Sequence, residues 1–360
     1  MKKFLKSALK TVAGPKAYAL AGSAWAWGRT LLNYWLFRLS RFIPFHVRAW
    51  PHALYVEGTN ICNAACVFCA YPEMVRPKKI MPMPLFFSLV DQYCAMGGGE
   101  VDVTPIVGDP FADASLFARL DYLAAKPSIR RFHFYTNGIA MRPELGDRLL
   151  GYGARLCVNV SYGGFDRDTY ARVMGVDKFD AVWPNLKHLI ERKAATGSGL
   201  GIAVNLRTPE SNNKGELFEY LKDCKRRGLI ELTWMGAYDS WSKHITDEEL
   251  RDVGLVPRPD PVKKGPCHRL LTTPVVLADG RVNACGCRDT EATLIIGDLN
   301  KSTLEEVLSG PALRDLIDSH ARGDFPEACR KCTYYDSVYP GWWPGQEGRP
   351  DPSVPVPTDR

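Results

Sequence analysis

From Ala53 onward the chain alternates short β-like runs with helical stretches, and no other feature limits the possible folds as strongly. This alternation is typical of βα units arranged around a parallel sheet. Six strands are predicted, at residues 53–57, 101–107, 131–135, 155–161, 200–206 and 230–235. Helices are predicted between them, at residues 85–96, 115–125, 144–152, 181–195 and 215–227. The sequence therefore predicts an α/β fold.

A second, smaller module is predicted from Cys267 onward, because a proline-rich stretch at residues 257–266 marks a boundary. The module opens with a hairpin around the turn Asp279-Gly280 and continues with a helix over residues 304–321. We therefore expect five regions. They are an N-terminal arm (1–50), the βα core (51–240), a linker (241–266), the second module (267–339) and a Pro/Gly-rich tail (340–360).

The N-terminal arm carries the positive charge of the protein. Residues 1–56 hold five Lys and four Arg and no acidic residue, whereas the remainder has 37 basic and 40 acidic groups, so we expect no nucleic-acid binding. The arm is also rich in aromatic residues, which suits attachment to an anionic membrane surface. Its longest uncharged window, residues 17–28, has 12 residues, fewer than the roughly 18 that a spanning helix needs.

Two other interpretations of the arm stay open. It could be a helix packed on the body of the protein, or a signal peptide, although Pro15 and Lys16 interrupt the apolar stretch that a signal peptide needs. The cysteine chemistry described next requires a reducing compartment. We therefore expect a cytoplasmic protein, peripheral on the cytoplasmic membrane face if the arm binds lipid.

Eleven cysteines in 360 residues are too few for a disulfide scaffold, so their grouping matters more than their number. Cys62, Cys66 and Cys69 lie within eight residues directly after the first predicted strand. Three thiolates can hold three irons of a 4Fe-4S cluster and leave the fourth iron open for another ligand. A structural zinc site would need a fourth protein ligand nearby. The pattern therefore indicates a cluster that binds a reactant.

The Cys-x3-Cys-x2-Cys spacing, with Phe68 before the last cysteine and Thr59-Asn60 ahead of the first, resembles the radical S-adenosylmethionine (radical SAM) superfamily. The resemblance implies a partial (β/α)6, TIM-like barrel and a 4Fe-4S cluster whose open iron binds S-adenosylmethionine (SAM). It also implies an electron donor such as flavodoxin or ferredoxin. One-electron reduction of SAM then gives methionine and a 5′-deoxyadenosyl radical, which removes hydrogen from an unactivated carbon.

The family also carries a Gly-Gly-Glu-Pro element at the end of strand two, and two segments resemble it. Residues 97–100 match the letters better but precede the predicted strand, whereas residues 107–110 lie where it ends, so we favour the latter although Asp109 replaces Glu. A turn residue or a surface charge is the alternative role for the further candidates. The cofactor-binding residues implied by the resemblance are Phe68, Gly108, Asp109, Pro110, Asn137, Ser161, Arg172 and Asn205.

The second module carries five more cysteines and resembles the SPASM/twitch extension of the same family. The resemblance implies the shorter twitch form, with one auxiliary 4Fe-4S cluster held by Cys267, Cys285, Cys329 and Cys332. A zinc ribbon with these four thiolates is the alternative. Cys287 is left over, and it could replace one ligand, be inert or donate a hydrogen atom.

A fully ligated auxiliary cluster favours electron transfer, and therefore dehydrogenation of a carbinol carbon, as in the twitch-type 2-deoxy-scyllo-inosamine dehydrogenases. Epimerisation, with Cys287 as hydrogen donor, is the close rival. We expect a sugar or cyclitol substrate, with a lipid-linked sugar included because of the arm. Maturation of a ribosomal peptide is the competing class, and a non-enzymatic iron-sulfur scaffold is a third. The candidates for catalysis or substrate contact are Cys287, Arg207, Tyr238, Tyr162, Trp234, Asp239 and His244.

Overall fold

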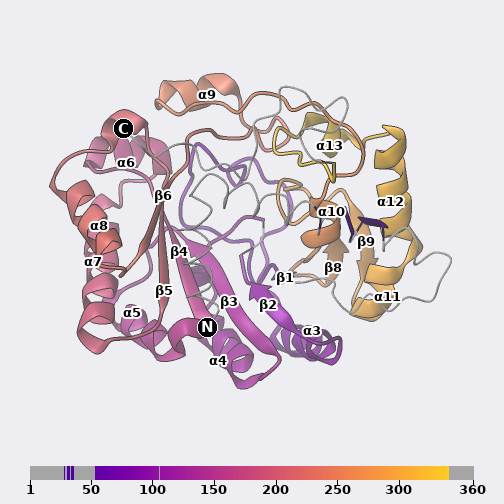
Figure 1. Ribbon diagram of the computed structural model, residues 1–360, viewed down its shortest axis with the longest axis horizontal. Helices are drawn as coiled ribbons and strands as arrows, with labels where there is room; N and C mark the ends of the chain where they lie inside the picture. The colour runs from indigo at the N-terminus through magenta and orange to yellow at the C-terminus, as the bar shows by residue number, and fades with distance from the viewer. Residues whose placement is uncertain (1–27, 29–30, 33, 36–52, 105, 340–360) are drawn as a thin grey trace, which may run out of the picture.

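The computed structural model describes residues 28, 31, 32, 34, 35, 53–104 and 106–339 (Figure 1). The predictions for the tail, and for most of the arm, lie outside these residues. Within the described residues, no helix is long and apolar enough to span a bilayer.

Six parallel strands form the core of the molecule, and each pairs with the next along the chain. They are β1 (Ala53–Val56), β2 (Gly99–Asp102), β3 (Ile129–Thr136), β4 (Leu156–Tyr162), β5 (Gly201–Leu206) and β6 (Glu231–Trp234). All six predicted strands are confirmed. The sheet does not close, because β6 forms one of its edges, so the fold is a partial barrel.

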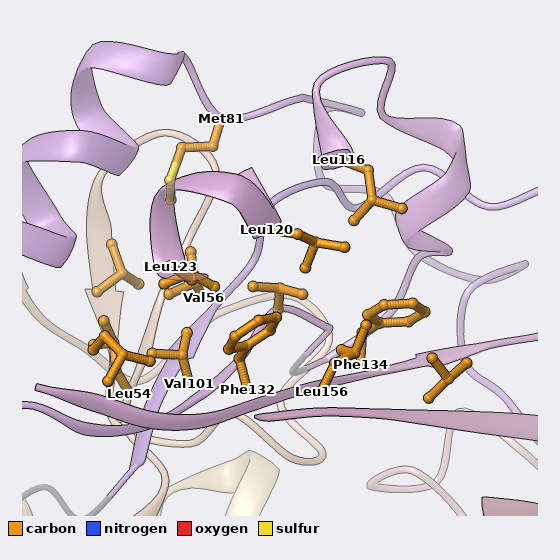
Figure 2. Packing of buried hydrophobic residues seen from close by; sticks show 14 of the residues in the cluster. Leu54, Val56, Met81, Val101, Leu116, Leu120, Leu123, Phe132, Phe134 and Leu156 are labelled. Atoms are coloured by element: carbon orange, nitrogen blue, oxygen red, sulfur yellow. The ribbon is translucent and has the colours of Figure 1, made fainter. Parts of the chain in front are cut away.

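Helices cover one face of this sheet (Figure 1). They are α3 (Met83–Ala95), α4 (Leu116–Ala125), α5 (Pro143–Leu149), α6 (Arg167–Met174), α7 (Phe179–Thr196) and α8 (Glu216–Arg226). Figure 2 shows Leu120 and Leu123 of α4 packed over Val101 and Phe132 of the sheet. Five of these helices were predicted. The eight-residue helix α6 was not, because so short an element shows little periodicity.

Alternate residues of each strand point away from the helices, toward the inner face of the barrel. On β1, Leu54 and Val56 are buried under the helices, whereas Tyr55 between them is only half-buried. On β3, Phe134 is buried and Tyr135 is exposed. The inner face therefore carries polar and aromatic side chains, as a substrate cavity needs.

The second module continues the same sheet instead of forming a separate one. Strand β7 (Val275–Val276) pairs in parallel with β1, and β8 (Arg281–Asn283) and β9 (Ile295–Asp298) follow antiparallel. The predicted hairpin is confirmed, and Gly280 adopts φ 91° in its turn, which favours glycine. The strand order β6-β5-β4-β3-β2-β1-β7-β8-β9 joins the two parts at β1. The division of the chain into the five regions stays a prediction.

Two sequence predictions are wrong in detail. Strand β2 begins at Gly99 and ends at Asp102, so the described residues 103, 104, 106 and 107 lie outside the strand although most of them are apolar. The helix expected over residues 304–321 is two helices, α11 (Leu304–Ser309) and α12 (Pro311–Arg322). They separate at Gly310, which has an extended backbone (φ −69°, ψ 168°), because a residue before proline disfavours the helical conformation. The remaining short helices are α9 (Asp247–Asp252), α10 (Arg269–Thr272) and α13 (Glu327–Lys331).

Candidate functional site

The loop that carries Cys62, Cys66 and Cys69 leaves the end of β1 and packs on the end of α6. The backbone N–H groups of Ala65 and Val67 donate to the carbonyls of Met174 (3.2 Å) and Val173 (3.1 Å). Gly175 ends α6 at φ 66°, and a Cβ there would lie 2.0 Å from the carbonyl oxygen of Ala65. Only glycine allows this contact, so Gly175 fixes where the cysteine loop lies.

The start of the loop is held by the Gly108-Asp109 segment that follows β2. Gly108 adopts φ 115°, and a Cβ there would lie 2.6 Å from the carbonyl oxygen of Thr59. The N–H of Asp109 donates to the carbonyl of Ile61 at 2.8 Å. This arrangement places residues 107–110 beside the cysteine loop. Residues 97–100 lie at the opposite end of β2, where Gly97 and Gly98 form the turn after α3 and Gly99 and Glu100 already belong to the strand.

The buried Asp109 carboxylate links the loop after β2 to the end of β3. It accepts hydrogen bonds from the N–H of Phe111 (3.0 Å), the hydroxyl of Thr136 (2.9 Å) and the N–H of Asn137 (2.8 Å). Burial raises the pKa of Asp109, and these hydrogen bonds oppose that rise. A carboxylate offers about four acceptor positions, so one remains for a ligand.

Other cofactor-binding candidates line the same end of the strands. The Asn137 amide donates to Asn63 at 2.7 Å and lies 3.8 Å from the Cys62 sulfur. Ser161 on β4 lies opposite Asn205 on β5. The Asn205 carbonyl accepts from the Thr233 hydroxyl at 2.8 Å, whereas its buried amide nitrogen has no hydrogen-bond partner in the described part of the chain. Pro110 begins a short 3-10 helix at residues 110–112.

The three thiols of the first cysteine loop lie in a poorly hydrated environment. Burial raises the pKa of Cys62 to about 12, that of Cys69 to about 11 and that of Cys66 as well. Among the described residues, no three His, Cys, Asp or Glu side chains gather around one point as a single metal ion requires. A 4Fe-4S cluster takes one thiolate on each iron and so separates its ligands more widely. Three thiols in one loop match three irons of such a cluster.

Phe68, Arg207 and Tyr238 form a group beside this loop. The Phe68 ring lies 5.7 Å from the Tyr238 ring and 5.8 Å from the Arg207 guanidinium. Arg207 also interacts electrostatically with the thiols of Cys66 and Cys69. The Arg207 Nε and the Tyr238 hydroxyl are buried without a hydrogen-bond partner in the described part of the chain. Such donors fit a bound polar ligand next to the cysteine loop, because unpaired buried polar groups are costly.

The cysteines of the second module also come together. Burial raises the pKa of Cys267 to about 11 and that of Cys332 to about 12, and neighbouring thiols contribute to the rise for Cys332. Burial likewise raises the pKa values of Cys285 and Cys329. The fifth cysteine, Cys287, interacts electrostatically with Cys285, Cys332 and Tyr55. Cys287 therefore lies close enough to the other thiols of this group to interact with them.

One segment connects the two cysteine groups, and we call residues Asp239–Lys243 the strap. The Trp241 indole N–H donates to the carbonyl of Phe68 at 2.8 Å, and the N–H of Ser240 donates to the Thr333 hydroxyl at 2.8 Å. Asp239 accepts from the Arg288 guanidinium at 2.5 Å. Trp241, Ser242 and Lys243 have φ values of 46°, 59° and 70°, and each such non-glycine residue costs about 1–3 kcal/mol. The contacts on both sides must hold this strained conformation.

Two predicted residues differ in their surroundings. Arg172 lies exposed in the last turn of α6, and its role as a cofactor contact stays a prediction. Tyr162 is fully buried with its ring against Phe165, Tyr170 and Trp183, so it belongs to the core. The sequence did not show which face of the strand the Tyr162 side chain occupies.

Two of the other candidates have side-chain partners that restrict their role. The Trp234 indole donates to the carbonyl of Thr208 at 3.0 Å. Asp239 is paired with Arg288, and His244 is half-buried directly after the strap. Sequence reasoning missed Arg288, Arg269, Trp241 and Tyr334, since nothing in their spacing marks them; only the long-range contacts bring them to the cysteines.

Comparison with known proteins agrees with this geometry. A family model described as the radical SAM superfamily matches residues 56–204, and one described as the SPASM iron-sulfur cluster-binding domain matches residues 267–333. The chain belongs to the radical SAM superfamily and carries a C-terminal SPASM domain. Its cofactors are a 4Fe-4S cluster that binds SAM and an auxiliary iron-sulfur cluster.

Curated relatives match only part of the chain. A GTP 3',8-cyclase of Pasteurella multocida is 26% identical over 209 residues, which are 55% of this chain and 59% of that protein. The molybdenum cofactor biosynthesis protein moc-5 of Caenorhabditis elegans is 25% identical over 182 residues, 49% of this chain and 28% of that protein. The chain thus spans about three fifths or less of the length of these relatives.

Two solved structures share the fold over most of the chain. A structure of BtrN in complex with AdoMet and 2-DOIA has a TM-score of 0.52 and 15% identity, and covers 80% of this chain and 95% of BtrN. A structure of anSMEcpe with bound AdoMet has a TM-score of 0.51 and 14% identity, and covers 78% of this chain and 85% of anSMEcpe. These likenesses support the partial barrel with its C-terminal extension.

Proposed function

We propose that this enzyme oxidises a carbinol carbon of a sugar or cyclitol to a ketone. The observation that carries the proposal is the second cysteine group, in which four half-buried thiols and a surplus Cys287 lie close together. Four thiolates saturate a 4Fe-4S cluster, which leaves no iron to bind substrate and favours a role in accepting electrons. A dehydrogenase needs such an acceptor close to the reacting carbon.

The residues of the first cysteine loop would hold the SAM-binding cluster, with Cys62, Cys66 and Cys69 each on one iron. When bound, this cluster supplies the one-electron cleavage of SAM that starts hydrogen removal, and the auxiliary cluster supplies an acceptor for the second electron. Cys267, Cys285, Cys329 and Cys332 would hold that auxiliary cluster.

The surrounding side chains would bind and orient SAM and substrate. We assign the SAM contacts to Asn137 and the Gly108–Pro110 segment, which contact the cysteine loop, and to Ser161 and Asn205, which are paired near the carboxyl ends of β4 and β5. The Phe68 ring lies next to the Arg207 guanidinium and the Tyr238 ring. The unpaired Nε of Arg207 and hydroxyl of Tyr238 would bind polar groups of SAM or substrate. The substrate would lose one hydrogen atom to the 5′-deoxyadenosyl radical, which becomes 5′-deoxyadenosine, one proton from its hydroxyl group to a base, and one electron to the auxiliary cluster.

The mass of the product tests this proposal. Anaerobic enzyme, SAM and a strong reductant would be incubated with a panel of aminocyclitols, sugars and sugar phosphates, and with GTP because the curated relatives are named as GTP cyclases. Dehydrogenation predicts a product that has lost two hydrogens together with stoichiometric 5′-deoxyadenosine. Turnover of a sugar or cyclitol with no loss of mass would contradict it.

Analysis of iron and sulfide tests the two clusters, and should give about eight of each per chain. About four of each, together with one zinc, would refute the auxiliary cluster.

Epimerisation is the second candidate, and Cys287 is the observation that favours it. The Arg288 guanidinium lies 3.4 Å from the Cys287 sulfur, which also interacts electrostatically with Tyr55 on β1. An epimerase would return a hydrogen atom from this thiol to the opposite side of the carbon. The Cys287→Ala variant should then lose product and deuterium incorporation from solvent, whereas a dehydrogenase should retain ketone formation.

Maturation of a ribosomal peptide remains the alternative class, and product formation from a peptide would indicate it.

We further propose that the basic aromatic arm attaches the enzyme to an anionic membrane surface, where lipid-linked sugars occur. The support is the charge of the arm. Among its described residues, Leu32 and Trp35 are exposed and Tyr34 is buried edge-on against Tyr339. The full chain should co-sediment with vesicles that contain anionic lipid and not with neutral vesicles. Equal behaviour with both would exclude this role.

A further inference from the structure

Three guanidinium groups surround a single aromatic ring in the second module. The guanidinium carbons of Arg288, Arg258 and Arg269 lie 4.3, 5.0 and 5.1 Å from the ring centre of Tyr334. The Arg269 guanidinium also lies 3.4 Å from the Tyr334 hydroxyl. Three positive charges around one ring repel one another, so the arrangement needs compensating negative charge.

The protein supplies only part of that negative charge. Arg288 pairs with Asp239 at 2.5 Å, with both side chains largely buried. Arg269 interacts electrostatically with the Asp336 carboxylate, but within the residues that the structure describes its buried Nε has no hydrogen-bond acceptor. The three arginines and these two aspartates leave a formal charge of +1.

This group lies near the first cysteine loop, because the Arg288 guanidinium is 4.3 Å from the ring centre of Trp241, whose indole N–H donates to the Phe68 carbonyl. Arg269 interacts electrostatically with Tyr55, and Tyr334 does so with Tyr135. Both tyrosines are inner-face residues, on β1 and β3, and Tyr135 is 37% exposed. The arginines therefore stand where a substrate inside the barrel could reach them.

We propose that Arg258, Arg269 and Arg288 around Tyr334 bind a phosphate group of the substrate, so that the substrate is a phosphorylated sugar or cyclitol. This inference rests on the proposed function and narrows its substrate class. Guanidinium groups bind phosphate oxygens through paired, charge-assisted hydrogen bonds, and a phosphate group offers three guanidinium groups more acceptor oxygens than a carboxylate does. The phosphate could be terminal, or could link the sugar to a nucleotide or a lipid.

The competing explanation is that these arginines only offset the charge of the auxiliary cluster. Arg269 interacts electrostatically with Cys267 and Cys287, and Arg288 with Cys287 and Cys332. If that were their sole role, neutralising Arg269 would change the reduction potential of the auxiliary cluster and leave phosphate binding unaffected. The two explanations therefore predict different effects of neutralising Arg269 on phosphate binding, which can be measured without turnover.

Binding of phosphorylated probes to the anaerobically loaded enzyme tests the proposal by calorimetry, without reductant. The probes are glucose 1-phosphate, UDP-glucose and vesicles that carry a polyprenyl phosphosugar, which distinguish the three sources of phosphate, with glucose and inorganic phosphate as references. We expect one phosphorylated sugar to bind at least about tenfold more tightly than glucose. Arg269→Gln and Arg258→Gln should each weaken that binding by about tenfold. Arg226→Gln, which alters a surface arginine whose side chain is 75% exposed, should leave it unchanged.

The outcome also separates this inference from the proposed function. Equal affinity for glucose and all three phosphosugars, or undiminished binding in both variants, would overturn the phosphate site. So would binding of inorganic phosphate alone. A shift of the auxiliary potential in Arg269→Gln without weaker binding would assign the arginines to the cluster instead. Tight binding that depends on the arginines but yields no dehydrogenated product would keep the phosphate site and contradict the oxidation.

Discussion

The indole N–H of Trp241 donates to the backbone carbonyl of Phe68 at 2.8 Å, which ties the strap to the loop between Cys66 and Cys69. The guanidinium carbon of Arg288 lies 4.3 Å from the ring centre of Trp241, and Arg288 directly follows Cys287. The Trp241 side chain therefore contacts a residue next to each cysteine group, Phe68 in the first and Arg288 in the second.

Removal of the Trp241 hydrogen bond should disturb the first cluster. Trp241→Phe keeps an aromatic ring under Arg288 but loses the N–H, at a cost of about 1 kcal/mol or more because the Phe68 carbonyl loses its donor. We expect a changed electron paramagnetic resonance spectrum of the reduced SAM-binding cluster and a higher KM for SAM. Trp234→Phe is the control, because it loses an indole bond to the Thr208 carbonyl, in a different loop. Equal spectra in both variants would show that the strap does not position the cluster loop.

Gly175→Ala should displace the cysteine loop. A Cβ at Gly175 would lie 2.0 Å from the Ala65 carbonyl oxygen, so the loop would have to move. Gly197→Ala is a matched control, since Gly197 also ends a helix at φ 66° but has no atom within 4 Å of the added Cβ. Both variants carry the backbone cost of about 1 kcal/mol, and only Gly175→Ala should also lose iron from the first site. Normal iron content and SAM cleavage in Gly175→Ala would contradict this role.

Asp109→Asn should weaken the link between the loop after β2 and the end of β3. In the natural chain the hydroxyl of Thr136 and the N–H of Asn137 donate to the Asp109 carboxylate. An asparagine replaces one acceptor oxygen with an NH2 group, which cannot accept these hydrogen bonds. Loss of hydrogen bonds to a charged acceptor costs about 1.5–3 kcal/mol each. Chemical denaturation should show a fall of that order in the free energy of unfolding. Asp166→Asn, at the exposed start of α6, should cost less, and a reversed order would refute the assignment.

The His133–Asp102 pair predicts a specific pH dependence of stability. Burial lowers the pKa of His133, but the Asp102 carboxylate, 3.0 Å away, more than offsets this, so the pKa is raised in the folded protein. A raised pKa stabilises the fold fully below the unfolded value of about 6.5, and this contribution is lost as pH rises through the folded value. The stability difference between the natural chain and His133→Gln should be larger at pH 5.5 than at pH 8.5. A difference that grows with pH would contradict the pair.

The parts of this structure that follow from local sequence were predictable. Alternating βα patterns located all six strands, and the spacing of Cys62, Cys66 and Cys69 located the first site. The end of β2 was missed because residues 103–107 continue an apolar pattern, although the chain must leave the sheet there to bring Asp109 to the loop. The break between α11 and α12 was also missed, because a single residue, Gly310, interrupts a stretch whose sequence is otherwise helical.

The remaining features depend on contacts between distant residues. Arg258, Arg269, Arg288 and Tyr334 are spread over 77 positions of the chain and meet only because β7 pairs with β1 and the strap lies against both cysteine groups. Side-chain direction is equally hidden in the sequence, since Tyr162 and Ser161 are neighbours on β4 and face opposite sides of the sheet. Such placement depends on the complete tertiary fold.

Cleavage of SAM by cysteine variants tests the central claim most directly. Cys62→Ala, Cys66→Ala and Cys69→Ala, purified without oxygen and supplied with SAM and a strong reductant, should form no 5′-deoxyadenosine. Cys224→Ala, which removes a buried thiol of α8 outside both groups, should cleave SAM as the natural chain does. Undiminished 5′-deoxyadenosine from any of the three loop variants would contradict the account.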